Sequence, residues 1–321
     1  MKKIILVPII IGSVVVVAGA VLLGVGIANA NKSLTRETKT YDNLEAFNNL
    51  NIKLSIADLE FYKAEDGKTK ILADETSVDK YEIGVSNSTL NIRFIDNREW
   101  YQRAFTWYTE SLKVKIYLPE ENYGDLTIDT ATGDTKLPSN FTFENLNYEA
   151  STGNLLLESK ITNYAKIKSS TGNNTIKGIS PNNLYIKDST GNINLEDVTT
   201  SEDITTDVST GKANMKNVTA KTLNIKASTG DVNLNNVVIQ EDVNIKTSTG
   251  DVKFSDFDGA LVEGKKISIK TDTGDVKGVF LTSKIFDVRA DTGHPSYPQS
   301  TKGSLCEIET DTGKIVVTIK G

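Results

Sequence analysis

Apolar and polar residues alternate along the second half of the chain in short runs that meet at a Thr-Gly pair. In VNIKTSTGDVKF (243–254), Val243 and Ile245 recur with period two before the pair, and Val252 and Phe254 do so after it. Side chains two residues apart share one face of a β-strand. The pattern predicts a strand, a turn and a second strand, and it recurs in LYIKDSTGNINL (184–195), LNIKASTGDVNL (223–234) and ISIKTDTGDVKG (267–278).

The Thr-Gly pair is the centre of an internal repeat. It occurs ten times between residues 131 and 314, at spacings of 19 or 20 residues apart from one spacing of 24. A fixed period of this length indicates a repeat architecture. We interpret the ten glycines as structural turn residues: Gly133, Gly153, Gly172, Gly191, Gly211, Gly230, Gly250, Gly274, Gly293 and Gly313.

Each repeat unit is too short to bury its own apolar face, and stacking on its neighbours solves that problem. The body outside the N-terminal segment also lacks helical periodicity. The sequence therefore predicts an all-β fold, a parallel β-solenoid of about 20-residue coils stacked about 4.8 Å apart. Its expected interior includes Ile186, Leu195, Ile225, Val232, Leu234, Ile245, Val252 and Ile269.

The turn residues each suggest a physical role. Glycine is the residue that most easily takes a positive φ at a sharp corner. If the alternation from Ile245 through Thr247 continues to Thr249, the threonine before each glycine points inward. The ten threonines would then form a hydrogen-bonded column inside the solenoid.

Two segments interrupt the repeat and are expected to form loops. The spacing of 24 contains SDFDGALVEGKK (255–266), and HPSYPQSTKGS (294–304) carries two prolines. Insertions in solenoids form loops on one face, where binding function is often located.

The first thirty residues predict a membrane anchor. Residues 4–28 carry no charge, and 25 helical residues span about 37 Å, enough to cross a bilayer core. Lys2 and Lys3 before this run predict a cytoplasmic N-terminus and an extracellular body, with the membrane as a partner of the chain. The alternative is a signal peptide cleaved after Ala30, since Ala28 and Ala30 fit the small-x-small pattern. Residues 31–43 are polar and predict a linker.

Residues 44–126 are expected to form an N-terminal β cap and opening coils before the repeat region, 127–321. Their strand-like runs include SIADLEF, TLNIRF and VKIYLP, and an aromatic segment interrupts them. These runs, followed by Thr-Gly-Asp/Asn repeats, resemble the DUF4097 family of β-strand-repeat proteins over roughly residues 44–321. The resemblance implies a surface β-solenoid, commonly behind one membrane helix in bacteria, that serves in adhesion. It implies no catalytic residues.

The aromatic segment REWYQRAFTWYTE (98–110) allows two interpretations. One is an exposed patch that binds glycans, a partner protein or the membrane headgroup zone. The other is a cap that covers the open end of the solenoid, since an uncovered strand edge invites aggregation. The candidate ligand-binding residues are Trp100, Tyr101, Phe105, Trp107 and Tyr108.

Composition limits the chemistry. The net charge of −6 argues against a nucleic-acid partner. With one cysteine, Cys306, and one histidine, His294, the chain has neither an intrachain disulfide framework nor a Cys-cluster metal site. Nothing in the sequence predicts a cofactor.

Aspartates near the C-terminus raise two further possibilities. Asp-Thr-Gly at 272–274 resembles the signature of aspartic proteases, but it recurs as part of the structural repeat, so we predict a turn there. Oxygen ligands stacked on adjacent coils can bind calcium. The candidate metal ligands are Asp251, Asp272, Asp275 and Asp291.

The sequence therefore predicts a non-catalytic, single-pass membrane protein whose extracellular solenoid has a binding or structural role, with other proteins or surface glycans as partners. One alternative is an envelope-stress or signalling accessory that contacts membrane proteins. The other is a β-helix enzyme acting on cell-wall glycans, for which a groove with paired carboxylates would be the expected mark.

Overall fold

The computed structural model describes residues 35–97 and 111–320. Within these ranges all regular structure is β-strand, as the sequence predicts, and no helix is long and apolar enough to cross a membrane. The predicted membrane span, residues 4–28, lies outside the described ranges and stays a prediction.

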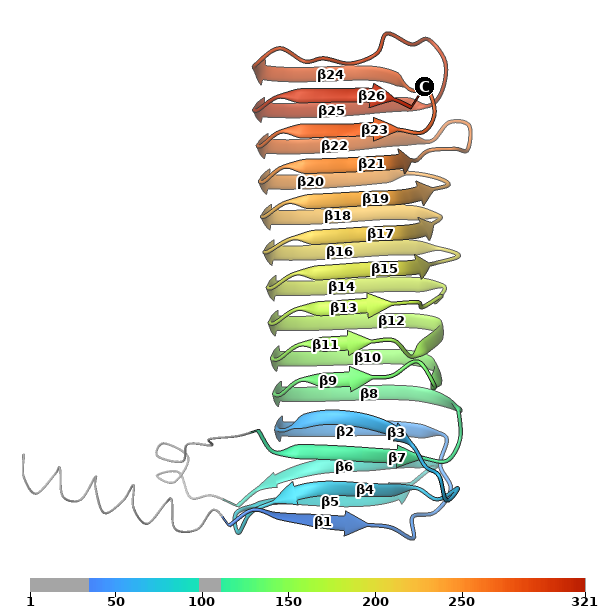
Figure 1. Ribbon diagram of the computed structural model, residues 1–321, viewed down its shortest axis with the longest axis vertical. Helices are drawn as coiled ribbons and strands as arrows, with labels where there is room; N and C mark the ends of the chain where they lie inside the picture. Colours follow the sequence, from blue (N-terminus) through green and yellow to red (C-terminus); the bar gives the residue numbers. More distant parts are fainter. Residues whose placement is uncertain (1–34, 98–110, 321) are drawn as a thin grey trace, which may run out of the picture.

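The strands form two sheets of 13, which we call sheet A and sheet B, stacked into one tall solenoid (Figure 1). Sheet A contains, in spatial order, β1 (Glu37–Tyr41), β4 (Lys70–Glu75), β7 (Lys113–Leu118), β3 (Asp58–Lys63), β9 (Thr135–Leu137), β11 (Leu155–Leu157), β13 (Asn174–Lys177), β15 (Ile193–Thr199), β17 (Ala213–Ala220), β19 (Val232–Ile239), β21 (Val252–Asp258), β23 (Val276–Phe280) and β26 (Ile315–Ile319). Sheet B contains β24 (Ile285–Thr292), β25 (Leu305–Thr312), β22 (Lys266–Thr273), β20 (Val243–Thr249), β18 (Thr222–Thr229), β16 (Asp203–Thr210), β14 (Asn183–Thr190), β12 (Lys160–Thr171), β10 (Thr142–Thr152), β8 (Asn122–Thr132), β2 (Asn49–Ile56), β6 (Thr89–Asp96) and β5 (Asp79–Ser86).

Each coil contributes one strand to each sheet, and equivalent residues of neighbouring coils pair in parallel. Ile225 of β18, for example, pairs with Ile245 of β20, and Val232 of β19 pairs with Val252 of β21. The inward columns of the two sheets face each other and form one continuous apolar core. All eight residues predicted for the interior are at most 2% exposed, which confirms the period-two assignment.

The glycine at nine of the ten corners, all but Gly313, is required for two reasons. Gly211 has a φ of 138°, a conformation that a side chain disfavours. A Cβ at this position would also lie 1.8 Å from the carbonyl oxygen of Gly191 in the preceding coil. The sequence predicted the positive φ, but the close approach of successive corners became visible only in the structure.

The prediction of inward threonines is wrong. All ten threonines that precede the glycines are exposed, and the inward position lies two residues earlier. The inward-outward alternation stops before each glycine, because the two residues preceding it both face solvent. In β20 the alternation that starts at Ile245 therefore holds for Thr247 and fails for Thr249. Inward threonine hydroxyls of the C-terminal coils cap the glycine corner of the adjacent coil: Thr271 Oγ1 donates to the carbonyl oxygen of Gly250 at 3.1 Å, and Thr310 Oγ1 to that of Gly274 at 3.0 Å.

The N-terminal end contains the antiparallel pairings of the fold. Strands β2 and β3 form a coil in which Ala57 occupies the corner position next to Gly133, and β8 runs across the predicted boundary at residue 126. Beyond that coil, β1 and β7 pair antiparallel with β4, and β5 pairs antiparallel with β6. These reversals end the regular stack.

At the C-terminal end, the coils do not follow sequence order. Strand β25 pairs with β22, and β24, which precedes it in the chain, lies outside β25 at the end of sheet B. The predicted loop at 255–266 begins later than expected, because residues 255–258 complete β21. The predicted loop at 294–304 connects β24 to β25, and Ser296 within it returns to form an isolated bridge with Val316 of β26.

Candidate functional site

A column of polar side chains runs along the glycine corners, and we call it the corner ladder. It consists of the Asp or Asn that follows most corner residues, and its Oδ1 atom accepts the backbone N–H of the equivalent residue in the adjacent coil. Lysine or histidine takes this place after three glycines, at Lys212, His294 and Lys314. Asn154 Oδ1 accepts the N–H of Asn173 at 2.9 Å, and Asp251 Oδ1 accepts that of Asp275 at 2.9 Å. The recurrence of Asp and Asn after Thr-Gly is therefore explained by coil stacking.

The corner ladder separates the four aspartates proposed as metal ligands. Asp251 and Asp275 belong to it, and their second oxygens contact Lys253 Nζ at 2.8 Å and Lys277 Nζ at 2.6 Å. These lysine hydrogen bonds, and then those from the backbone, lower the pKa of both carboxyls. Asp272 and Asp291 lie two residues before their glycines and are exposed. Within 35–97 and 111–320, no three His, Cys, Asp or Glu side chains are grouped so that they could hold a metal ion.

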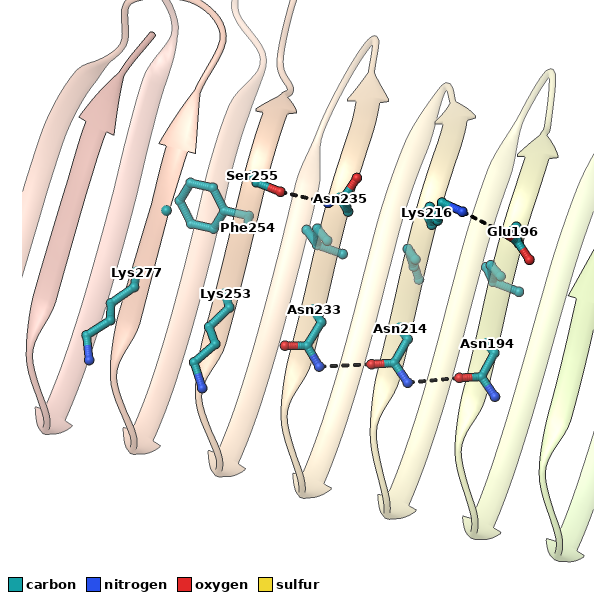
Figure 2. A pocket seen from close by; sticks show the side chains of 14 residues that line it. Asn194, Glu196, Asn214, Lys216, Asn233, Asn235, Lys253, Phe254, Ser255 and Lys277 are labelled. Carbon is teal, nitrogen blue, oxygen red and sulfur yellow. Dashed lines mark hydrogen bonds and ion pairs between the residues drawn. The ribbon is translucent and has the colours of Figure 1, made fainter.

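A groove of about 640 Å³ lies on the outer face of sheet A, across β15, β17, β19, β21 and β23 (Figure 2). One wall is a second ladder of three amides, in which Asn214 Nδ2 donates to Asn194 Oδ1 at 2.8 Å and Asn233 Nδ2 donates to Asn214 Oδ1 at 2.9 Å. Lys253 and Lys277 continue this row. We call this surface the sheet A groove.

The other wall of the sheet A groove is a row of four polar side chains. Glu196 contacts Lys216 Nζ at 2.7 Å, and Asn235 Nδ2 donates to Ser255 Oγ at 3.0 Å. Lys216, and then Lys177 at 3.4 Å, lowers the pKa of Glu196, so this carboxylate stays charged and acts poorly as a general acid. Among the described residues that line the groove, Glu196 is the sole acid.

The strands of sheet A bend at a second corner, directly after the row of four polar side chains that starts at Glu196. Asp197, Asn217, Asn236 and Asp256 each have a φ between 49° and 55° and interrupt the extended backbone of their strands. Asn217 Nδ2 donates to Asp197 Oδ1 at 2.7 Å, and Asn236 Nδ2 to Asn217 Oδ1 at 2.9 Å. Sequence reasoning missed this corner, although an Asp or Asn six residues after the glycine in four successive repeats signals it, because these residues tolerate positive φ.

The five candidate aromatic residues, Trp100 to Tyr108, lie outside the described ranges. Their segment connects β6, which ends at Asp96, to β7, which begins at Lys113. Both the patch and the cap interpretations stay predictions.

Two buried polar clusters interrupt the apolar core. Asp188 is fully buried, and it accepts hydrogen bonds from Asn174 Nδ2 at 2.9 Å and from the backbone N–H of Thr190 at 3.1 Å. Burial raises the pKa of its carboxyl. Near the C-terminal end, Lys284 is 2% exposed and its Nζ contacts Asp258 Oδ1 at 2.7 Å. Both clusters are enclosed and internally paired, so they stabilise a particular packing and offer no open site.

The family of the chain is decided by a match that covers most of its length. The model of the Toastrack DUF4097 family matches residues 47–202 and 181–321. The chain belongs to the Toastrack DUF4097 family. This confirms the resemblance seen in the sequence, and the stacked coils of Figure 1 are the form that the family takes here.

Several solved structures match the chain at low sequence identity, while no curated protein matches it. A "putative adhesin" from Parabacteroides distasonis is 11% identical with a TM-score of 0.48, and the match covers 89% of this chain and 97% of that one. A "putative adhesin" from Parabacteroides merdae is 14% identical with a TM-score of 0.38 and the same coverage. A "putative cell adhesion protein" from Clostridium sporogenes is 12% identical with a TM-score of 0.21, covering 88% and 100%. At these identities and scores the likenesses carry no argument about function.

Proposed function

We propose that this Toastrack protein is a non-catalytic surface protein that is anchored in the cell membrane through residues 4–28, with its N-terminus in the cytoplasm and its solenoid outside the cell. In this proposal the solenoid binds a surface partner along the sheet A groove. One observation supports the absence of catalysis in this proposal. The groove has a single carboxylate, Glu196, which is held charged between two lysines. Hydrolysis of a glycan needs two carboxyl groups across the bond.

The amide ladder suits the groove to binding. Each amide has two donor hydrogens and two acceptor lone pairs, and the ladder occupies only part of this capacity. Because the ladder fixes each side chain, the remaining donors and acceptors are held in place before a ligand arrives, which lowers the entropic cost of binding. Their repeat equals the coil spacing, about 4.8 Å, so an extended, hydroxyl-rich chain such as a surface glycan fits this surface.

The test is co-sedimentation of the full chain, in detergent micelles, with purified bacterial cell-wall sacculi. Asn214→Leu removes the central amide of the ladder, and Asn224→Leu removes an exposed amide on the outer face of sheet B as the matched control. We expect sacculus binding that Asn214→Leu weakens about tenfold and Asn224→Leu leaves unchanged, since loss of a buried or shared hydrogen bond costs about 1–3 kcal/mol. Equal binding by the two variants would rule out the groove as the binding surface.

A further inference from the structure

The two sheets end differently at the C-terminal tip. Sheet A ends at β26, and Ser296 covers part of its edge through hydrogen bonds to the backbone of Ile315 at 2.8 Å and Val317 at 3.0 Å. Pro295 and Pro298 flank Ser296, and proline lacks the N–H that a further strand would need. Sheet B ends at β24, whose outer edge has no strand partner among the described residues and contains no proline.

The inward side of β24 is incompletely covered. Phe286, Val288 and Ala290 are half-buried, whereas their register partners on β25, which include Cys306 and Ile308, are at most 1% exposed. Tyr297 packs against Phe286 with ring centroids 6.0 Å apart, and the core column is otherwise left partly open at the sheet B tip. A free edge beside exposed core positions is a template for another strand.

On the outward side of β24, Asp287 is weakly paired among the described residues. Asp287 lies in register with another acid, Glu307 of β25. Arg289 reaches Asp287 only at 3.4 Å, and their side chains are 73% and 49% exposed. Glu307 is itself paired with Lys266 Nζ at 2.9 Å, and Arg289 lies in register with Glu309. A cation placed on the open side of Asp287 would therefore complete the pairing of this carboxylate.

We propose that β24 pairs antiparallel with β24 of a second copy of this chain, centred on Val288, to form a tip-to-tip dimer. In this register Asp287 lies opposite the second copy's Arg289, and Arg289 opposite the second copy's Asp287. On the inward side Val288 meets its own equivalent and the large Phe286 meets the small Ala290. The pairing is self-complementary, as a two-fold interface must be.

Neighbouring registers are disfavoured by the same charges. Antiparallel partners must share a face, so the centre can shift only in whole residues along β24. Centring on Asp287 places Asp287 opposite its own copy. Centring on Arg289 places Arg289 opposite its own copy and Asp287 opposite Asp291. Of these three centres, Val288 alone brings both opposite-charge pairs together and avoids like charges. Centring on Ala290 would pair Arg289 with Asp291, but it leaves Ile285 and Phe286 beyond the end of the second copy's strand at Thr292.

The dimer has a consequence that rests on the proposed function. The C-terminal tip lies at the opposite end of the solenoid from β1, the first described strand (Figure 1). A two-fold axis through Val288 places the two solenoids end to end with their N-terminal ends pointing apart. Two copies anchored in facing membranes would therefore be joined tip to tip, which is a homophilic contact.

The experiment is disulfide trapping of the full chain in detergent micelles. Opposed residues in an antiparallel pair have Cβ atoms about 4.5–5.5 Å apart, close to the span of a disulfide. Val288→Cys should yield a covalent dimer on mild oxidation that a reductant reverses. Val316→Cys, on the closed end of sheet A, is the matched control, and wild type controls for the buried Cys306. A Val288→Cys dimer yield no higher than that of Val316→Cys would overturn the proposal.

Charge reversal then tests the register. In the Val288→Cys background, Arg289→Asp places acids opposite each other and should lower the dimer yield at least about fivefold, whereas Asp287→Arg combined with Arg289→Asp should restore it. An unchanged yield with Arg289→Asp would contradict the proposed pairing. Because no sacculus is present, this assay can fail while wall binding succeeds, and the reverse also holds.

Discussion

At the scale of single residues, a recurrent place for a polar side chain in the interior is the inward position three residues before a corner glycine. Ser169 and Asp188 lie there, while Val208 and Ala227 take the same place in the following coils. Asn174, on the facing sheet, donates to both Ser169 and Asp188. The three polar residues therefore satisfy one another. They fix how these coils stack, because pairing with the wrong coil would leave Asp188 among apolar side chains.

The raised pKa of Asp188 predicts how stability depends on pH. The folded chain keeps this proton at pH values where the unfolded carboxyl, with a pKa of about 3.9, has lost it. Asp188 therefore lowers stability above its folded pKa, and the penalty is relieved as the pH falls. We expect the free energy of unfolding of wild type, measured against Asp188→Ala by urea titration, to improve from pH 7 to pH 4.5. The exposed Asp272→Ala serves as control, and a wild-type minus Asp188→Ala difference that is constant with pH would refute the assignment.

At the scale of elements, the repeat contained most of what is needed to predict the coil. Period-two alternation identified the core columns, and the recurrent glycine identified the corner. The threonine column was misplaced because two successive residues face outward before each glycine, and no propensity marks where alternation stops. The exchange of β24 and β25 could not be predicted either, since IFDVRADTG and LCEIETDTG fit the same slot equally well. The sheet A groove depends on contacts between coils, which the pattern within one coil does not contain.

The close approach of successive corners predicts a sharp difference between two glycines. Gly211→Ala should lower the free energy of unfolding by about 3 kcal/mol or more, because the new methyl group meets the Gly191 carbonyl at 1.8 Å and φ is positive. Gly84→Ala, in a strand with no neighbour within 4 Å, should be neutral or stabilise the chain by up to about 1 kcal/mol. Thermal unfolding followed by circular dichroism measures both. Similar changes for the two variants would show that the corners are not in contact.

At the scale of the whole molecule, the solenoid is a rod whose two ends have different roles. Antiparallel strands close the N-terminal end, and β24 leaves an edge open at the C-terminal tip. The inward side chains pack into the core that joins the coils. The outer faces carry ladders of amides and ion pairs that repeat with the coils. Such a body presents binding groups at a distance from its point of attachment, which is what the proposed surface function requires.

The proposal that the solenoid lies outside the cell is tested most directly by finding which side of the membrane its C-terminal tip faces. Lys302→Cys introduces a reactive thiol in the exposed connection between β24 and β25, while native Cys306 is buried with a pKa raised to about 12 by burial. Intact cells that express this variant are treated with a membrane-impermeant maleimide, and wild type is treated in parallel. We expect labelling of Lys302→Cys on intact cells at the level seen after lysis, and none of wild type. Labelling that appears only after lysis would contradict the outward-facing solenoid.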